Sequence, residues 1–113
     1  FPPIVDPSAT IAAEVAIGDA AQVMAGAVIQ PRCVLGVDVI VNTRAAIDHD
    51  CIIGDHAFVS PGAVLCGAVR IGAHAFVGAG AVVLPEAEVG EGAVVQAGAV
   101  LAGIVPAGGF FDR

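Results

Sequence analysis

The stretch VSPGAVLCGAVRIGAHAFVGAGAV, residues 59–82, decides the fold because it consists of four copies of one six-residue pattern. Each copy begins with Val, Leu or Ile and carries Ala or Val at its fifth position. Outward from this stretch, the pattern holds at seventeen consecutive steps of six residues that begin at Val5 and reach Leu101. Every first position is Val, Ile or Leu, and every fifth position is Ala, Val or Cys. A sustained short period of this kind indicates a repeat architecture rather than an ordinary globular core.

The six-residue pattern also predicts which side chains face inward. The fifth position of one copy and the first position of the next are two residues apart, so on a strand they share a face and form the core. The third and fourth positions are left for the corner between strands, where a missing amide donor or a positive φ is tolerated. Prolines occupy third positions at Pro7, Pro31, Pro61 and Pro85, and glycines occupy fourth positions at Gly26, Gly62, Gly80, Gly92 and Gly98.

A second period of eighteen residues sets the size of one coil. Glycines recur at this interval at Gly18, Gly36, Gly54, Gly72 and Gly90. Three copies per coil give a triangular cross-section, so the sequence predicts an all-β protein, a parallel β-helix of about five to six coils over residues 5–106. At about 4.8 Å per coil, this prism would be about 27 Å tall. We interpret residues 1–4 as the end of a linker from a missing N-terminal domain, and residues 107–113 as a C-terminal tail.

Composition narrows the range of partners. The chain of 113 residues is long enough for one domain, and its net charge of −7 argues against nucleic acid and anionic membranes as partners. No apolar run reaches the roughly 18 residues that a membrane span needs, so we expect a cytoplasmic protein. The three cysteines lack metal-ligand spacing, which favours a reducing compartment. Two of them, Cys33 and Cys51, fill fifth positions and are predicted to be buried, reduced thiols.

The segment IDHDC, residues 47–51, carries the chemistry that the pattern does not require. His49 falls at a third position and therefore at an outward corner, and Gly67, eighteen residues later, should lie directly above it. A base beside an open backbone N–H is the arrangement that acyl transfer needs. A solvated corner histidine without function is the alternative interpretation.

The other two histidines, His56 and His74, are eighteen residues apart at a different corner, with Asp55 beside the first. Because His49 lies elsewhere, a three-histidine metal centre would have to form across a subunit interface, and no metal site is expected within one chain. Phe58 and Phe76 form a similar outward stack that is suited to a subunit interface.

The segment VNTRAAIDHDCIIGDHAFVSPGAVLCGAVRIG, residues 41–72, resembles the hexapeptide-repeat sugar acetyltransferases of the sialic acid O-acetyltransferase and bacillosamine-pathway N-acetyltransferase type. The resemblance implies a left-handed coil and places the family's His-acid-Cys motif at residues 49–51. It implies that His49 is the general base, that Asp50 orients it, and that the Gly67 N–H is the oxyanion hole. Asn42 would contact the acceptor, a sugar or nucleotide-sugar.

The resemblance further implies acetyl-CoA as the acyl donor, with contacts at Phe58, Ala79 and Ala97, and direct transfer without a covalent enzyme intermediate. The family often has a histidine where this chain has Phe58, and its usual Gly-Asn-Pro-Ala ending is missing here. The flat Ala-, Val- and Gly-rich surface predicts a homotrimer in which the base of one subunit meets acetyl-CoA held by its neighbour.

Two alternatives remain open at this point. One is a non-catalytic β-helical trimerisation scaffold or fragment, which acetyl-CoA binding would separate from the enzyme. The other is a zinc enzyme similar to the γ-type carbonic anhydrases, which metal analysis would detect.

Overall fold

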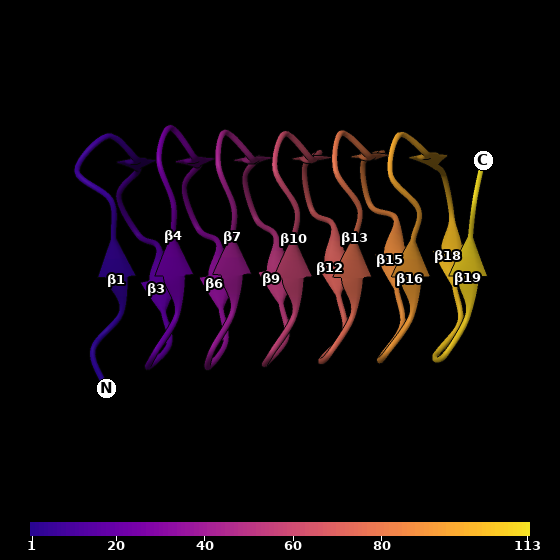
Figure 1. The fold of residues 1–113 in the computed structure, drawn as a ribbon, viewed down its shortest axis with the longest axis horizontal. Coiled ribbons are helices and arrows are strands. Elements are labelled where there is room, and N and C mark those ends of the chain that lie inside the picture. Colours follow the sequence, from indigo (N-terminus) through magenta and orange to yellow (C-terminus); the bar gives the residue numbers. More distant parts are fainter.

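The computed structural model describes residues 1–113 as nineteen two-residue strands that wind into a stack of coils (Figure 1). The strands form three parallel sheets, one on each side of a triangular prism. Sheet A contains β1 (Ile4–Val5), β4 (Gln22–Val23), β7 (Ile40–Val41), β10 (Phe58–Val59), β13 (Phe76–Val77), β16 (Val94–Val95) and β19 (Phe110–Phe111). Sheet B contains β2 (Thr10–Ile11), β5 (Val28–Ile29), β8 (Ala46–Ile47), β11 (Val64–Leu65), β14 (Val82–Val83) and β17 (Val100–Leu101). Sheet C contains β3 (Ala16–Ile17), β6 (Val34–Leu35), β9 (Ile52–Ile53), β12 (Arg70–Ile71), β15 (Glu88–Val89) and β18 (Ile104–Val105).

The fold is the left-handed parallel β-helix that the sequence pattern and the family resemblance predicted. Up to β17, each strand residue pairs with the residue eighteen positions later, as in the pair Phe58 and Phe76. The molecule measures 33 Å along its longest axis, somewhat more than the 27 Å expected for residues 5–106 alone, because the described chain extends beyond both ends of that range. The structure has no helix of the length and hydrophobicity that a membrane span requires.

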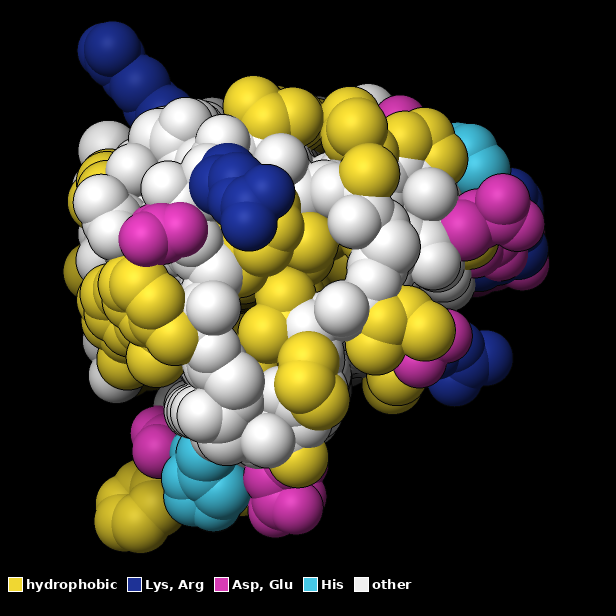
Figure 2. Space-filling view, turned by 90° about the vertical axis from the view of Figure 1, so that its right-hand side faces the viewer, with side chains coloured by type: hydrophobic (Ala, Val, Ile, Leu, Met, Phe, Trp, Pro, Cys, Tyr) yellow, Lys and Arg dark blue, Asp and Glu magenta, His cyan; other side chains and the backbone are white.

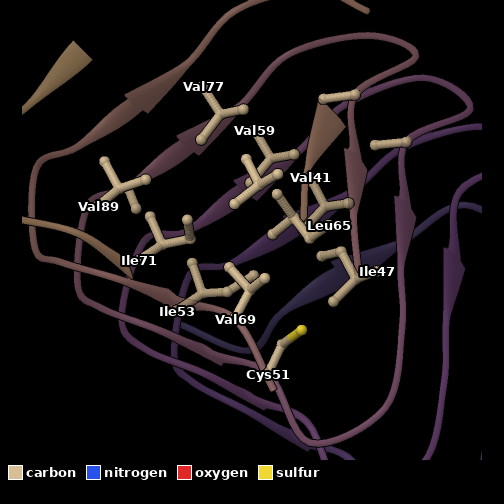
Figure 3. Close-up of a cluster of buried hydrophobic side chains, with 14 of the residues drawn as sticks. Val41, Ile47, Cys51, Ile53, Val59, Leu65, Val69, Ile71, Val77 and Val89 are labelled. Atoms are coloured by element: carbon tan, nitrogen blue, oxygen red, sulfur yellow. The ribbon is translucent and has the colours of Figure 1, made fainter. Parts of the chain in front are cut away.

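The core is a single column of apolar side chains inside the prism (Figure 3). It contains 29 buried residues, and every one occupies a first or fifth position of the six-residue pattern, as predicted. Ile47 of β8, Ile53 of β9 and Val59 of β10 illustrate how side chains from the three sheets converge on this interior. Burial is lost only in the first coil, where nothing covers the lower side of Val5 and Ile11.

The corners of the prism adopt a left-handed backbone conformation at the fourth position of the pattern. The five fourth-position glycines have positive φ, as predicted, but ten residues with side chains have it too. Those residues are Glu14, Ala20, Arg32, Asp38, Arg44, Asp50, His56, Ala68, His74 and Glu86. Each such residue costs about 1–2 kcal/mol. Hydrogen bonds between coils help to hold the corners, as between the Asp50 N–H and the Pro31 carbonyl at 3.1 Å.

The glycines spaced by eighteen have a steric cause. They follow the strands of sheet C, where the backbone of the next coil passes directly overhead. A Cβ added at Gly54 would lie 2.6 Å from the Ala73 amide nitrogen, and one at Gly72 would lie 2.6 Å from that of Glu91. No side chain fits at these glycine positions, so the sequence period marks close backbone approach.

The strict six-residue spacing ends at Leu101, which corrects the prediction that it continues unbroken to the end of the helix. Only two residues separate β17 from β18, and Glu88 pairs with Ile104, sixteen rather than eighteen residues away. Val105 stays buried because the shortened turn moves it from a fifth position into the place of a first. The last strand, β19, lies within residues 107–113, and its pairing with β16 continues sheet A.

The burial of two cysteines predicts selective thiol labelling. Cys33 and Cys51 are fully buried, and burial raises the pKa of both thiols, to about 12 for Cys51. The thiolate is the reactive form, so we expect a reagent at pH 8 to label only the half-buried Cys66 in the native protein. Mass spectrometry should find one modification per chain, and none in Cys66→Ser. Rapid labelling of all three thiols without denaturant would contradict this core.

Candidate active site

The candidate site is built on the corner between sheets B and C, directly after β8. The Asp48 carboxylate accepts the His49 backbone N–H at 2.8 Å, and Asp50 turns the chain with φ of 61°. This turn directs the His49 side chain outward, where it is 53% exposed. Figure 2 shows, in the view along the prism, that histidines project from two of the corners, while hydrophobic side chains occupy much of the sides.

The His49 ring is held by its neighbour in the sequence. Its Nδ1 lies 2.8 Å from the Asp50 Oδ2. Hydrogen bonds from Arg32 and, to a smaller extent, from His49 hold the pKa of the Asp50 carboxyl below its usual range. A deprotonated carboxylate can only accept, so in the neutral ring the Nδ1 of His49 carries the proton and Nε2 has the free lone pair. The ring is therefore set up to act as a base through Nε2.

Sequence reasoning did not find the second partner of Asp50, which is Arg32. The Arg32 Nε donates to Asp50 Oδ1 at 3.0 Å, and its Nη2 donates to Oδ2 at 3.1 Å. The two residues are eighteen positions apart and occupy the same corner in consecutive coils. The spacing of eighteen residues was therefore the feature of the sequence from which the contact between Arg32 and Asp50 could have been predicted.

Gly67 lies against the free side of the His49 ring. A Cβ added at Gly67 would come within 2.8 Å of both Cε1 and Nε2 of the imidazole, so only glycine leaves the ring in this place. The Gly67 N–H makes no hydrogen bond within the protein. The carbonyl of the same peptide, that of Cys66, accepts a hydrogen bond from the Cys51 thiol at 3.1 Å. This bond fixes the peptide plane and with it the direction of the open N–H.

A surface cavity of about 430 Å³ joins these groups. It is lined by Asp48, His49, Cys66, Gly67, Ala68, Pro85 and Glu86. The structure thus brings His49, Asp50 and Gly67 together, and His49 and Gly67 line one cavity. Proton abstraction by Nε2 beside a donor for a developing oxyanion is the chemistry that this arrangement supports.

The other residues that the sequence analysis assigned to the site lie away from the His49 corner. Asn42, Ala79 and Ala97 share the corner between sheets A and B, at the opposite edge of sheet B from His49. The Ala79 and Ala97 N–H groups make no hydrogen bond within the protein. Phe58 lies on the outward face of sheet A and stacks on Phe76 with ring centroids 5.3 Å apart.

The third corner, between sheets C and A, carries the histidine stack. The rings of His56 and His74 lie 4.8 Å apart, and the His56 Nδ1 lies 3.0 Å from the Asp38 Oδ2. No group of three or more His, Cys, Asp or Glu side chains in the chain is arranged to hold a metal ion.

Comparison with known proteins finds bacterial transferases that are similar to this chain. Residues 68–103 match the bacterial transferase hexapeptide family (six repeats). No curated protein matches the chain. Among solved structures, the acetyltransferase domain of PglB from Neisseria gonorrhoeae FA1090, in complex with acetyl coenzyme A, is 41% identical with a TM-score of 0.95, over 96% of this chain and 53% of that one.

Two further structures are similar over nearly the whole chain. PerB from Caulobacter crescentus, in complex with CoA and GDP-perosamine, is 36% identical with a TM-score of 0.91, over 95% of this chain and 53% of that one. WeeI from Acinetobacter baumannii AYE is 32% identical with a TM-score of 0.89, over 92% of this chain and 51% of that one. The chain therefore spans about half the length of these three structures.

The contact between Gly67 and the imidazole gives a test of the site geometry. In Gly67→Ala the new methyl group has to displace the His49 ring from Asp50. We expect the ¹⁵N resonances of His49 to shift, while those of His56 and His74 stay in place as internal references. The free energy of unfolding should change by less than about 1 kcal/mol, because the substituted residue is at the surface. Unchanged His49 resonances would show that the ring does not lie against Gly67.

Proposed function

Because this chain is a hexapeptide-repeat β-helix similar to sugar acetyltransferase domains, we propose that it transfers an acetyl group from acetyl-CoA to a sugar or nucleotide-sugar. The observation that carries the proposal is the His49 ring, with Nδ1 bound to Asp50 and Nε2 next to Gly67, whose N–H makes no hydrogen bond within the protein. PglB was solved with acetyl coenzyme A, and PerB with CoA and GDP-perosamine, which supports the same donor and acceptor class here.

The proposed mechanism is direct transfer. Nε2 of His49 takes a proton from the acceptor, whose nitrogen or oxygen attacks the thioester carbonyl. The Gly67 N–H stabilises the oxyanion, and the tetrahedral intermediate collapses as the bond from carbon to sulfur breaks. The imidazolium then returns its proton to the CoA thiolate. General-base assistance contributes about 10²–10⁴-fold, and one oxyanion donor about 10²–10³-fold.

The charge of the cavity favours an amine over a hydroxyl as the acceptor. Asp48 and Glu86 line it beside His49, and the whole chain has a net charge of −7. Carboxylates attract an amino sugar as its cation, which releases one proton to solvent before its neutral nitrogen attacks and gives a second proton to His49. Of the two reactions considered, N-acetylation is therefore the better supported, and competing amino and hydroxy sugars in one assay would separate them.

We further propose a homotrimer with sheet B facing the threefold axis. The outward residues of this sheet are small and uncharged, namely Thr10, Val28, Ala46, Val64, Val82 and Val100. The two edges of sheet B are the His49 corner and the corner of Asn42, Ala79 and Ala97. Threefold packing on this face would join the first corner of one subunit to the second corner of the next, and so complete a site between them. The three free cysteines support the cytoplasm as its compartment.

His49→Ala tests the proposed base. We expect kcat to fall about 10²–10⁴-fold with little change in acetyl-CoA affinity, because the ring acts on the acceptor proton. Asp50→Asn should cost less, since it keeps the imidazole. His56→Ala and His74→Ala are matched controls at another corner and should cost little. The assay uses steady-state kinetics with the longest available form of the enzyme. Near-normal turnover of His49→Ala would contradict the mechanism. If activity instead required zinc and was lost in the His56 or His74 variants, the carbonic anhydrase-like alternative would be favoured.

Val64→Glu tests the trimer and the shared site together. Val64 is 37% exposed on sheet B, and a buried charge at the axis should dissociate the subunits. Light scattering should change from about 33 kDa, three times the 11.1 kDa chain, to the monomer, and calorimetry should show loss of acetyl-CoA binding. Ile52→Glu, at a similarly exposed position of sheet C, is the matched control. If the wild-type protein is a monomer at micromolar concentration, the shared site is contradicted. If it is a trimer that does not bind acetyl-CoA, the scaffold alternative is favoured.

A further inference from the structure

We propose that Arg32 is a positioning residue for the base: its guanidinium fixes the Asp50 carboxylate so that His49 keeps its proton on Nδ1 and presents Nε2 to the acceptor. The inference rests on the proposed function for its catalytic consequence. Its structural consequence, the tautomer of His49, can be measured without any substrate.

The geometry is a fork that holds both oxygens of the carboxylate. Arg32 donates to Oδ1 at 3.0 Å and to Oδ2 at 3.1 Å, and the same Oδ2 receives the Nδ1 of His49 at 2.8 Å. Two-point contact fixes the carboxylate plane as well as its position, which one hydrogen bond does not. The direction of the Asp50 oxygen that holds His49 is therefore set from the coil below.

The solvent exposure of the ion pair between Arg32 and Asp50 indicates a positioning role rather than a contribution to stability. The side chains of Arg32 and Asp50 are 53% and 43% exposed, and an ion pair this exposed to solvent contributes little to stability. The core does not need it, because all 29 core residues lie at other positions of the pattern. The ion pair with Arg32 restricts the motion of the exposed Asp50 carboxylate. That carboxylate is the only side chain that makes a hydrogen bond to the His49 ring.

Arg32 also offsets charge around the base. The acidic groups near the ring are Asp48 and Asp50 on its own turn and Glu86, two coils above on the same cavity wall, with Glu14 below Arg32. Arg32 is the cation among them. Without it, the unopposed carboxylates would favour the protonated imidazole, which cannot accept a proton from the acceptor.

The experiment compares Arg32→Gln and Arg32→Lys with wild type. Arg32→Gln removes the charge, whereas Arg32→Lys keeps the charge and loses the fork. Arg70→Ala, which removes an arginine from the outward face of sheet C, is the matched control. The first measurement is ¹⁵N NMR of the three histidines in the substrate-free protein above the pH at which their rings titrate, with His49 assigned from its loss in His49→Ala.

We expect wild type and Arg70→Ala to show the Nδ1–H tautomer at His49. Arg32→Gln should populate Nε2–H substantially, with Arg32→Lys in between. In kinetics, Arg32→Gln should lower kcat about tenfold at unchanged KM for acetyl-CoA, and should move the acid limb of the pH–rate profile to higher pH. Arg32→Lys should lower kcat by a smaller factor and should leave the acid limb of the pH–rate profile unchanged.

The outcomes are distinct. If Arg32→Gln keeps the wild-type tautomer, kcat and pH profile, the pair is only a surface ion pair and the proposal is overturned. If the tautomer changes while His49→Ala keeps full turnover, the positioning is real but the proposed base is wrong. If His49→Ala loses turnover and Arg32→Gln changes neither tautomer nor rate, only the role of Arg32 fails.

Discussion

From the second coil to β17, each residue of this protein sits above the residue eighteen positions before it, because every strand pairs in parallel with the corresponding strand of the previous coil. This register fixes the interior and the surface at the same time. It stacks Val, Ile, Leu, Ala and Cys into one buried column, and it stacks the corner residues into three outward columns. The contacts of the site that bridge coils, from Arg32 to Asp50 and from His49 to Gly67, are contacts between residues eighteen apart.

The corners separate stability from chemistry. Their cost is a left-handed backbone at ten residues with side chains, and hydrogen bonds between coils help to offset it. In return, third and fourth positions contribute no core burial, so they can carry His49, Asp50 or Gly67 without loss of packing. Side chains of the site can therefore be exchanged while the prism remains, which is why the proposed tests can separate loss of function from loss of fold.

Much of this was predictable from the sequence, and the exceptions have physical causes. The period of six predicted the core residues, and the period of eighteen placed Gly67 over His49. A spacing of eighteen predicts which residues stack at a corner but not the direction of a long side chain. The two hydrogen bonds from Arg32 to Asp50 were therefore missed. The shortened last coil was missed because Val105 satisfies both spacings. Asn42, Ala79 and Ala97 lie across sheet B from His49, and a single chain does not join the two corners.

A crystal structure of the protein with acetyl-CoA tests the central claim most directly, because it shows what the Gly67 N–H and the His49 Nε2 face. The account predicts that the thioester oxygen lies about 2.7–3.1 Å from the Gly67 nitrogen, with the His49 ring beside the carbonyl carbon and Asp50 still bound to Nδ1. Acetyl-CoA bound with its thioester away from this corner, or a Gly67 N–H that points elsewhere, would contradict it.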